Sequence, residues 1–398
     1  MPARTRRPGL TATWDQVLAR RVAAHHLDTP SGDGLVPLVR RLCGVHAQLA
    51  SAAEAAIWLR TGGAVGPVGV RRALAEDRTL VKTWALRGTL HLLPAADLPM
   101  WAAALGTRSF PRPKSWYDYH GVTPEDMAAL EATVPEVLTG TPMTRDELAI
   151  GVADRAGRPQ LAERLRSGWG AVLKPMAARG QLAFGPPDGR SVTFVVPAAW
   201  LGEWAPVQPE RAVPDLVRAI LDCYGPFGLD ELTRWTALDR PVLRAAVAAL
   251  GDEVVELDTE GHRGWITASG ADAVRAAEPS RVVRLLPGFD PYVIGALRQL
   301  DRLVPAPEHK AAVSRTSGWI SPVLLDGGRI AGTWTQESTG GRLAIEITPF
   351  GPLRRGVKAA AEAEAARWAT YAAAPLHLTW SPESHPHEPV PTSRSPGD

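Results

Sequence analysis

The clearest hydrophobic pattern lies in the middle of the chain. Thr144 precedes Glu147 by three residues, the capping-box spacing that satisfies free backbone amides at a helix start. A second helix is predicted over 167–179, and apolar runs at 181–184 and 191–195 predict two strands joined by a turn that contains Pro and Gly. Two helices followed by a hairpin, called the wing, are typical of a winged-helix module.

The same order of elements recurs on both sides of this segment. After a linker rich in Pro and Trp, the predicted helices lie at 213–224, 229–236 and 240–250, and the strands at 254–257 and 264–266. The N-terminal region has predicted helices at 14–25, 35–42, 50–59 and 68–76 and strands at 80–86 and 89–93. Three copies of one architecture are therefore predicted, although their sequences are not repeats.

From about residue 280 the pattern changes to short strands separated by Gly and Pro turns. The predicted strands lie at 282–286, 323–325, 330–334 and 343–347. This pattern predicts a small β-sheet or barrel. An Ala- and Glu-rich helix is predicted over 353–372, and the tail after Pro375 is predicted to be disordered.

These patterns predict an α+β protein, mostly helical, with three tandem winged-helix domains followed by a small β-barrel or β-sheet domain. The predicted boundaries are 1–120, 121–205 and 206–279 for the winged helices, 280–375 for the β-rich domain with its terminal helix, and 376–398 for the disordered tail. A chain of 398 residues is long enough for this division.

Composition narrows the class of protein. The 44 Lys and Arg residues against 42 Asp and Glu residues leave a net charge of +2, so any nucleic-acid footprint must come from local placement of charge. Cys43 and Cys223 lie far apart without metal-ligand spacing, so we expect no disulfide, no metal and a cytoplasmic location. The N-terminus lacks the apolar core of a signal peptide, and no run of about 18 apolar residues predicts a membrane span.

Four segments carry a resemblance to a known family. They are GVHAQ at 44–48, WALRGTLH at 84–91, LLPGFDPY at 285–292, and GWISP at 318–322 with GTW at 332–334. In these segments the chain resembles the AlkZ/YcaQ-like family of bacterial winged-helix DNA glycosylases. The resemblance spans nearly the whole chain, and the segments follow the order found in the family.

The resemblance implies a cup of tandem winged helices that binds double-stranded DNA and excises alkylated bases, often bulky guanine adducts or crosslinks made by genotoxic natural products. The family's catalytic element is two polar residues separated by an apolar one, which here becomes His46-Ala47-Gln48. The first residue departs from the more common Gln. The motif resembles the His-x-Gln variant, which is associated with resistance to large intercalating guanine alkylators.

The chemistry of such a substrate is compatible with these residues. An N7-alkylated guanine is cationic, so its glycosidic bond is already weak and the enzyme mainly has to guide a water molecule. His46 can accept a proton from this water and Gln48 can orient it, which makes these two the predicted catalytic residues. The alternative for an isolated His-x-Gln is a histidine at a helix end, bonded to backbone or packed in the core.

The spacing of the motif adds a geometric condition. Residues two apart point to one side only on extended or turn-like backbone, because on a regular helix they diverge by about 200°. We therefore predict that the motif follows a helix break, and Gly44 is the expected position of that break.

Five further residues are predicted to contact DNA. Arg87 and His91 are expected near the motif, where they would meet phosphate or the lesion strand; alternatively they form a structural strand and turn, with Arg87 paired to a carboxylate. Arg190, Arg263 and Arg329 lie at predicted hairpin turns. Phosphate contact and simple solvation are the two interpretations of these three arginines.

Several residues of the C-terminal segments have a structural interpretation. Trp319 and Trp334 are predicted to pack in a core or between domains. Asp290 and Tyr292 either line the cup or fix the junction between the winged helices and the β-rich domain.

The predicted function is that of a monofunctional DNA glycosylase, acting as a nucleoid-associated cytoplasmic monomer on duplex DNA that carries alkylated guanine, without metal, cofactor or membrane. The main alternative is a non-catalytic winged-helix transcription regulator, since fold does not determine function. A regulator is expected to form a symmetric dimer, and no dimerisation helix is evident. A winged-helix protein that binds protein or RNA is the second alternative.

Overall fold

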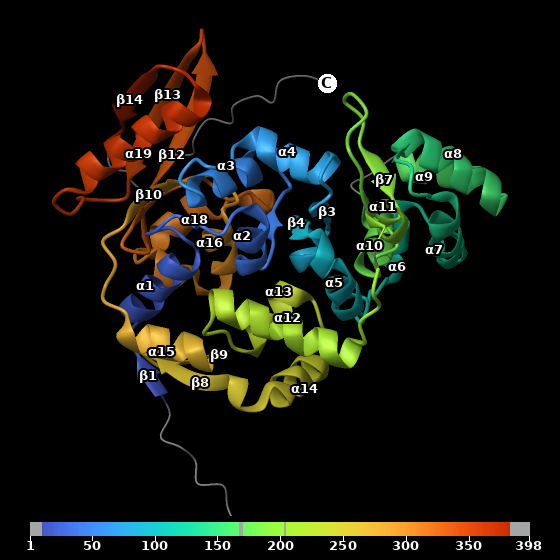
Figure 1. Cartoon of the computed structure of the whole chain (residues 1–398), viewed down its shortest axis with the longest axis horizontal. Helices are drawn as coiled ribbons and strands as arrows, with labels where there is room; N and C mark the ends of the chain where they lie inside the picture. Colours follow the sequence, from blue (N-terminus) through green and yellow to red (C-terminus); the bar gives the residue numbers. More distant parts are fainter. Residues whose placement is uncertain (1–9, 167–169, 203, 383–398) are drawn as a thin grey trace, which may run out of the picture. The chain divides into compact units, whose positions relative to one another are not determined.

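The computed structural model describes residues 10–166, 170–202 and 204–382, and it confirms the α+β class (Figure 1). The chain divides into two compact units, residues 1–278 and 279–398. The division falls where the hydrophobic pattern changes to short strands. The described strands form three open sheets and no closed barrel.

The first part of the larger unit contains most of the elements that its apolar periodicity predicts. They are β1 (Leu10–Ala12), α1 (Trp14–Ala24), α2 (Leu35–Arg41), β2 (Val45–His46), α3 (Ala50–Arg60), α4 (Pro67–Ala75), β3 (Leu80–Trp84), β4 (Leu90–Pro94) and α5 (Leu98–Leu105). Helix α1 begins with a capping box between Thr13 and Gln16, which satisfies its first amides. Strand β1 and helix α5 were not predicted.

The middle part was predicted less completely. It contains α6 (Lys114–His120), α7 (Pro124–Val137), β5 (Met143–Thr144), α8 (Arg145–Ala156), α9 (Gln160–Arg166), α10 (Lys174–Ala178), β6 (Ala183–Phe184), β7 (Thr193–Val195) and α11 (Pro197–Leu201). The capping box is confirmed: the Glu147 amide donates to Thr144 Oγ1 at 3.3 Å, and the Thr144 amide donates to Glu147 Oε2 at 2.7 Å.

The single helix predicted over 167–179 is wrong. Residues 167–169 lie outside the described residues, and the rest forms a short 3₁₀ turn followed by α10. Gly170 has φ 73°, and a Cβ there would lie 2.4 Å from Trp84 Cζ2. The chain turns at this glycine because only a residue without a side chain fits against the indole.

One six-stranded sheet joins the first and middle parts in the order β2-β4-β3-β6-β7-β5. The two predicted hairpins meet where Lys82 of β3 pairs with Phe184 of β6. Trp84 also packs edge-on against Phe184, with ring centroids 4.8 Å apart, and belongs to the core of the middle part. The shared core holds the sheet, at whose edge β2 lies, as one structure.

The third part begins with helices and ends with a hairpin and a helix. It contains α12 (Pro209–Tyr224), α13 (Leu229–Thr236), α14 (Arg240–Leu250), β8 (Val254–Thr259), β9 (His262–Thr267) and α15 (Ala268–Ala276). Strand β1 pairs in parallel with β8, with Leu10 aligned to Leu257, and Trp14 lies in the same core as Leu257 and Ile266. The N-terminal segment therefore belongs to the hairpin of the third part.

The second unit is an open five-stranded sheet with short helices. It contains β10 (Val283–Leu286), α16 (Pro291–Gly295), α17 (Leu300–Leu303), α18 (Lys310–Val313), β11 (Val323–Asp326), β12 (Arg329–Thr339), β13 (Arg342–Pro349), α19 (Val357–Ala372) and β14 (Leu376–Trp380). The strands follow one another in chain order, with β10 and β14 at the edges. The predicted sheet is found and the barrel alternative is not.

The disordered tail predicted over 376–398 is wrong for its first residues. Strand β14 pairs in parallel with β13, and Leu376 is aligned with Leu343. Leu376, Leu378 and Trp380 alternate with more exposed residues, a period of two that is typical of a strand with one covered face. Residues 383–398, the rest of the predicted tail, lie outside the described residues.

Two tryptophans of the second unit differ from each other. Trp334 is buried, and its indole Nε1 donates to the Leu286 carbonyl at 2.8 Å, as expected for core packing. Trp319 is 43% exposed and lies edge-on to Phe289, so the prediction of core packing is wrong for this residue.

Asp290 and Tyr292 stabilise the second unit internally. The Asp290 carboxylate caps α16 by accepting from the Tyr292 amide at 2.9 Å. The Tyr292 hydroxyl donates to the Gly328 carbonyl at 2.8 Å. Both residues are buried, so these contacts hold a loop of the unit in place.

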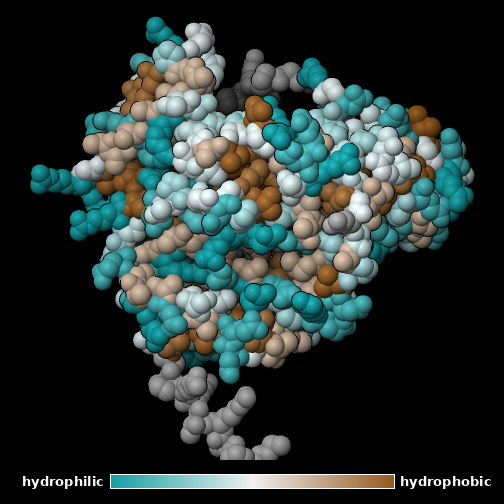
Figure 2. Space-filling model, viewed as in Figure 1, coloured by the Kyte–Doolittle hydropathy of each residue, from teal (hydrophilic) through white to brown (hydrophobic). Residues whose placement is uncertain are grey.

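Hydrophobic and hydrophilic residues are mixed over the face of the molecule shown in Figure 2. Figure 2 shows hydrophobic residues in small groups between hydrophilic ones. Within the described residues, no helix combines the length and apolar character needed to cross a membrane.

Candidate active site

The helical course of the chain ends directly before the His46-Ala47-Gln48 motif. Helix α2 ends at Arg41, and Gly44 adopts φ 87°. A Cβ at this glycine would lie 2.7 Å from Leu93 Cδ2, so both the backbone angle and the available space require glycine. The motif then starts on strand β2, which confirms the predicted helix break at Gly44.

Strand β2 places His46 beside a second histidine. His46 is aligned with His91 of β4, and the two imidazole rings lie nearly perpendicular with centroids 5.5 Å apart. The Ala47 amide donates to the Leu90 carbonyl at 2.7 Å and extends the pairing by one residue. The sheet therefore brings together two residues that are separated in the sequence by two helices and strand β3.

Both imidazoles are buried and uncharged at neutral pH. His46 is 5% exposed, and burial lowers its pKa to about 3, with smaller contributions from the charges of His91 and Arg87. Burial also lowers the pKa of His91 to about 4, although a hydrogen bond to the Thr89 carbonyl acts in the opposite direction. An unperturbed histidine has a pKa near 6.5, so neither ring adds positive charge here at pH 7.

The hydrogen bond of His91 assigns its tautomer. Nδ1 lies 3.0 Å from the Thr89 carbonyl oxygen, which can only accept, so Nδ1 of the neutral ring carries the proton and donates it. Nε2 then keeps its lone pair. His91 is only 2% exposed and its ring lies against that of His46, which favours packing beside His46 over the predicted contact with DNA.

Gln48 lies in the bend between β2 and α3 and is exposed. Leu49 beside it is also exposed. The two polar residues of the motif therefore differ in access: the imidazole is buried at the sheet edge and the carboxamide is accessible at the surface. A His-x-Gln spacing does not reveal this difference.

Arg87 lies half-buried in the turn between β3 and β4, with φ 56°. Its guanidinium carbon is 5.9 Å from the centroid of the Trp235 ring. Burial lowers its pKa, and the charge of Arg234 lowers it further. The strand and turn of the structural alternative are present, but no carboxylate of the described residues forms an ion pair with Arg87; contact of Arg87 with DNA stays a prediction.

Arg108 is a neighbour of His91 that sequence reasoning missed. Its Nε donates to the Thr236 carbonyl at 2.7 Å, and its Nη2 donates to the Ala85 carbonyl at 2.9 Å. These bonds connect the β3–β4 turn to the end of α13. Burial lowers its pKa to about 10, so Arg108 remains charged at pH 7. No local pattern marks it, because its partners are distant backbone carbonyls.

The other three predicted DNA contacts lie on other elements of the two units. Arg190 is exposed in the turn between β6 and β7, and Arg263 on β9 forms an ion pair with Asp258 at 3.3 Å. Arg329 belongs to the second unit and donates to the Arg302 carbonyl at 2.7 Å. Neither Arg190 nor Arg263 is among the charges that shift the pKa of His46 or His91, and phosphate contact by the three arginines stays a prediction.

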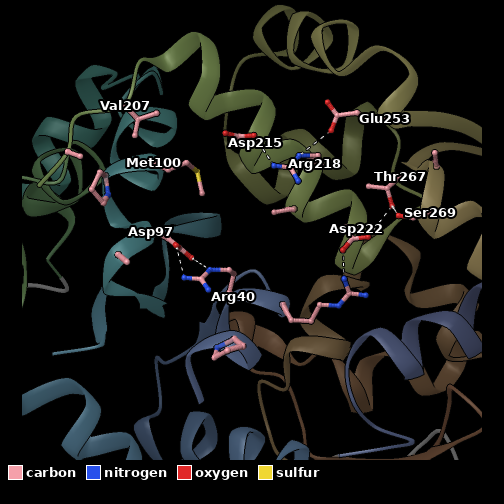
Figure 3. Close-up of a pocket in the computed structure, with 17 residues that line it drawn as sticks. Arg40, Asp97, Met100, Val207, Asp215, Arg218, Asp222, Glu253, Thr267 and Ser269 are labelled. Atoms are coloured by element: carbon pink, nitrogen blue, oxygen red, sulfur yellow. Dashed lines mark hydrogen bonds and ion pairs between the residues drawn. The ribbon is translucent and has the colours of Figure 1, made fainter. Parts of the chain in front are cut away.

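A cavity of about 1010 Å³ lies elsewhere in the first unit (Figure 3). Its charged groups are paired, as in Arg40 with Asp97, Arg218 with Asp215, and Arg41 with Asp222. No predicted site residue lines it. The charged groups of this cavity form ion pairs that connect neighbouring elements, so the cavity has a structural role and is not the candidate active site.

The described residues contain no group of three or more His, Cys, Asp or Glu side chains placed to hold a metal ion. Cys43 and Cys223 are both buried and free. Burial raises the pKa of both thiols, to about 12 for Cys223, so neither thiol is ionised at neutral pH.

Comparison with known proteins gives consistent matches. The family model described as DNA glycosylase AlkZ-like matches residues 39–371, which include the His46 motif. An interstrand DNA cross-link repair glycosylase of Streptomyces sahachiroi is 40% identical over 366 residues, covering 90% of this chain and 96% of that protein. The solved structure of Streptomyces sahachiroi DNA glycosylase AlkZ matches with a TM-score of 0.84 and 37% identity, covering 93% of this chain and 100% of that one.

Proposed function

Because the chain belongs to the AlkZ-like DNA glycosylase family, we propose that it hydrolyses the N-glycosidic bond of bulky N7-alkylguanine adducts in duplex DNA. One observation carries the proposal: an uncharged imidazole, His46, lies on the edge strand β2, and an exposed carboxamide, Gln48, follows two residues later. Crosslinks are included because the similar Streptomyces protein is named for their repair. The activity would serve repair or resistance to the organism's own genotoxin.

The proposed reaction needs no proton for the leaving base. The oxygen of water bonds to C1′ of the deoxyribose while the C1′–N9 bond breaks. The electron pair of the C1′–N9 bond leaves with the cationic base, which becomes neutral. The proton of water passes through His46 to solvent. The products are free N7-alkylguanine and an abasic site, so the proposed enzyme is monofunctional and leaves the strand intact.

A neutral His46 suits a transition state that carries positive charge on the sugar. A protonated imidazole would repel this charge, whereas the lone pair of a neutral ring attracts and orients water. Since its pKa is about 3, His46 resembles a carboxylate in basicity, and its main contribution is to orient and polarise water. His91 would act as a positioning residue for this ring.

Gln48 complements the imidazole. A carboxamide can accept one hydrogen bond from water and donate another to the sugar or its phosphate, and Gln48 is accessible to do so. Because Gln48 lies next to the buried imidazole, the attacking water can contact DNA on one side and His46 on the other.

The helix and hairpin order of the first unit supports the proposal of three tandem winged-helix modules that bind duplex DNA as a monomer. Arg190 and Arg263 on the hairpins, and Arg329 in the second unit, are the proposed phosphate contacts. A bulky adduct need not be turned out of the helix to expose C1′, so we include catalysis without base flipping in the proposal.

The decisive experiment uses a duplex with one N7-methylguanine and a second duplex with a bulkier N7 adduct. Purified protein is incubated with each, and abasic sites are cleaved with alkali. We expect strand breaks only after alkali, and a rate about 10³-fold lower for His46→Ala, since a group that orients and deprotonates water contributes about 10²–10⁴-fold.

The matched control is His377→Ala, because His377 is an exposed histidine of the second unit. It is expected to cleave at the wild-type rate. Equal rates for the two alanine variants would remove His46 from the mechanism, and absence of abasic sites on both duplexes would overturn the proposed activity.

A further inference from the structure

A group of positively charged side chains near His46 and His91 has no role in the proposed reaction. A recess of about 270 Å³ opens at the β3–β4 turn, and Arg87, Arg108 and Lys174 are among the residues that line it. No acidic side chain belongs to its lining. Pockets that hold drug-sized ligands run from about 300 to 1,000 Å³, so this recess suits a small group.

Lys174 resembles Arg87 in being half-buried without a counter-charge. It lies at the start of α10, and burial lowers its pKa. No carboxylate of the described residues forms an ion pair with it. Its Nζ lies near Gly88, since a Cβ on that glycine would be 3.9 Å away. Lys174 and Arg87 thus approach the same turn from different elements.

Arg108 supplies a third charge in a fixed place. Its two hydrogen bonds to backbone carbonyls use donors but leave the net charge uncompensated. Arg112, the remaining cation of the lining, is different because it pairs with Glu131 at 2.5 Å. Three cations of the recess therefore lack an ion-pair partner among the described residues.

Such an arrangement is unfavourable in the free protein. Removing a cation from water costs free energy unless an opposite charge compensates for it, and like charges in one recess raise the cost. Burial lowers the pKa of both Arg87 and Lys174, which reflects the desolvation part of this cost. An anion in the recess would reverse it, because it would pair with all three cations at once.

The recess also adjoins the candidate active site. The charge of Arg87 acts on both His46 and His91, and the charge of Arg108 acts on His91. We infer that the recess binds one phosphate of the DNA backbone next to the lesion, with Lys174 and Arg87 as ligands and Arg108 as a fixed counter-charge. The position next to the lesion rests on the proposed function, whereas the choice of a phosphate rests on the charges.

A phosphate held here would fix the sugar relative to His46. Sequence-independent contacts to phosphate determine the register of a protein on DNA. One phosphate in a recess that also carries the β3–β4 turn would place the adjoining C1′ at a constant distance from β2. Binding and positioning would then depend on the same contact.

The test replaces single phosphates by neutral methylphosphonates on both sides of an N7-methylguanine and measures the dissociation constant of each duplex. Wild-type protein is expected to lose about tenfold in affinity at one position, which is the effect of one charge-assisted contact. Lys174→Gln is expected to bind the normal duplex about tenfold more weakly and to lose clearly less than wild type at that position, because Arg87 and Arg108 remain.

The controls separate this contact from general charge. Lys114→Gln removes a lysine of the same unit that pairs with Asp118 at 2.8 Å, and it is expected to keep the wild-type pattern. Lys174→Arg keeps the charge and is expected to restore sensitivity at the same phosphate. If Lys174→Gln melts at a lower temperature than wild type, Arg87→Gln replaces it in the same set of binding measurements.

Two results would overturn the inference. One is a Lys174→Gln or Arg87→Gln variant that keeps wild-type sensitivity at every position. The other is a wild-type protein that is insensitive to every methylphosphonate. The comparison of wild type and variants on normal and methylphosphonate duplexes measures binding, so its outcome does not depend on base release. If it supports the phosphate site but no base is excised, the proposed function is contradicted and the phosphate site is not.

Discussion

The cavity around Asp222 and the recess around Arg87 are both lined by arginines of the first unit. They differ in whether carboxylates compensate for the positive charges. Asp222 accepts from the buried Arg20, from Arg41 and from Thr267, so one carboxylate joins several elements. Around Arg87 the cations have backbone carbonyls and an aromatic ring as neighbours. The balanced charges around Asp222 stabilise the fold, whereas the unbalanced charges around Arg87 are those that we propose bind a phosphate.

This difference could not be seen from residue counts. Both regions contribute arginines to a chain whose net charge is only +2. What separates them is the presence of a carboxylate in one and its absence from the lining of the other. The comparison therefore predicts opposite responses of stability and binding to mutation.

The largest expected effect is on the balanced region. Asp222→Asn removes the counter-charge of Arg20, whose side chain is 4% exposed, and is expected to lower the free energy of unfolding by about 3 kcal/mol. Urea denaturation measures this change. Arg40→Ala, which breaks a pair whose arginine is 51% exposed, should change it by less than about 1 kcal/mol.

The comparison fails if Lys174→Gln destabilises the protein as much as Asp222→Asn does. We expect its free energy of unfolding to stay constant or to rise, because the substitution removes a half-buried cation that forms no ion pair with any described residue.

The second prediction concerns pH, since protonated histidines would add charge to the unbalanced region. The folded pKa values of His46 and His91, about 3 and about 4, lie below the unfolded value of about 6.5, so the unfolded chain binds more protons in between. Stability is therefore lost as the pH falls below 6.5, by about 0.7 kcal/mol per histidine between pH 7 and 6.

Urea denaturation at several pH values measures this loss. The buried His25 contributes in the same direction, because its pKa is also lowered well below the usual value. The matched comparison is therefore between wild type and His91→Gln, whose stability should depend less steeply on pH. Identical slopes would show that His91 titrates normally.

The smallest expected effect is stabilisation by free phosphate. If the recess binds this anion weakly, about 100 mM inorganic phosphate should raise the free energy of unfolding of wild type by about 1 kcal/mol. Sodium chloride at equal ionic strength is the reference, and Lys174→Gln should respond less than wild type. A variant that responds like wild type would place the anion elsewhere.

Local elements could be predicted wherever the signal was local. Helices Leu229–Thr236 and Arg240–Leu250 have the predicted bounds, because apolar spacing and flanking residues define both ends. The break at Gly44 and the extended backbone at His46 also follow from a rule about neighbouring residues. The strand at 376–380 was missed because the polar composition of the tail outweighed a short alternation.

The candidate site could be predicted in part. His46, Gln48, Arg87 and His91 were identified through the resemblance, and the structure brings three of them into one electrostatic environment. Arg108 and Lys174 carry no motif, because their significance arises from neighbours that are distant in the sequence. Burial of His46 beside an exposed Gln48 was likewise beyond a spacing rule.

The sequence by itself determined most of the helical and extended segments, where the motif leaves the helix, and which family the segments resemble. Only the tertiary structure decided that β1 joins the third hairpin, that His46 meets His91, and that three cations share one recess. The reason is physical: backbone preference and periodicity act between neighbours, whereas desolvation and charge balance depend on which distant residues pack together.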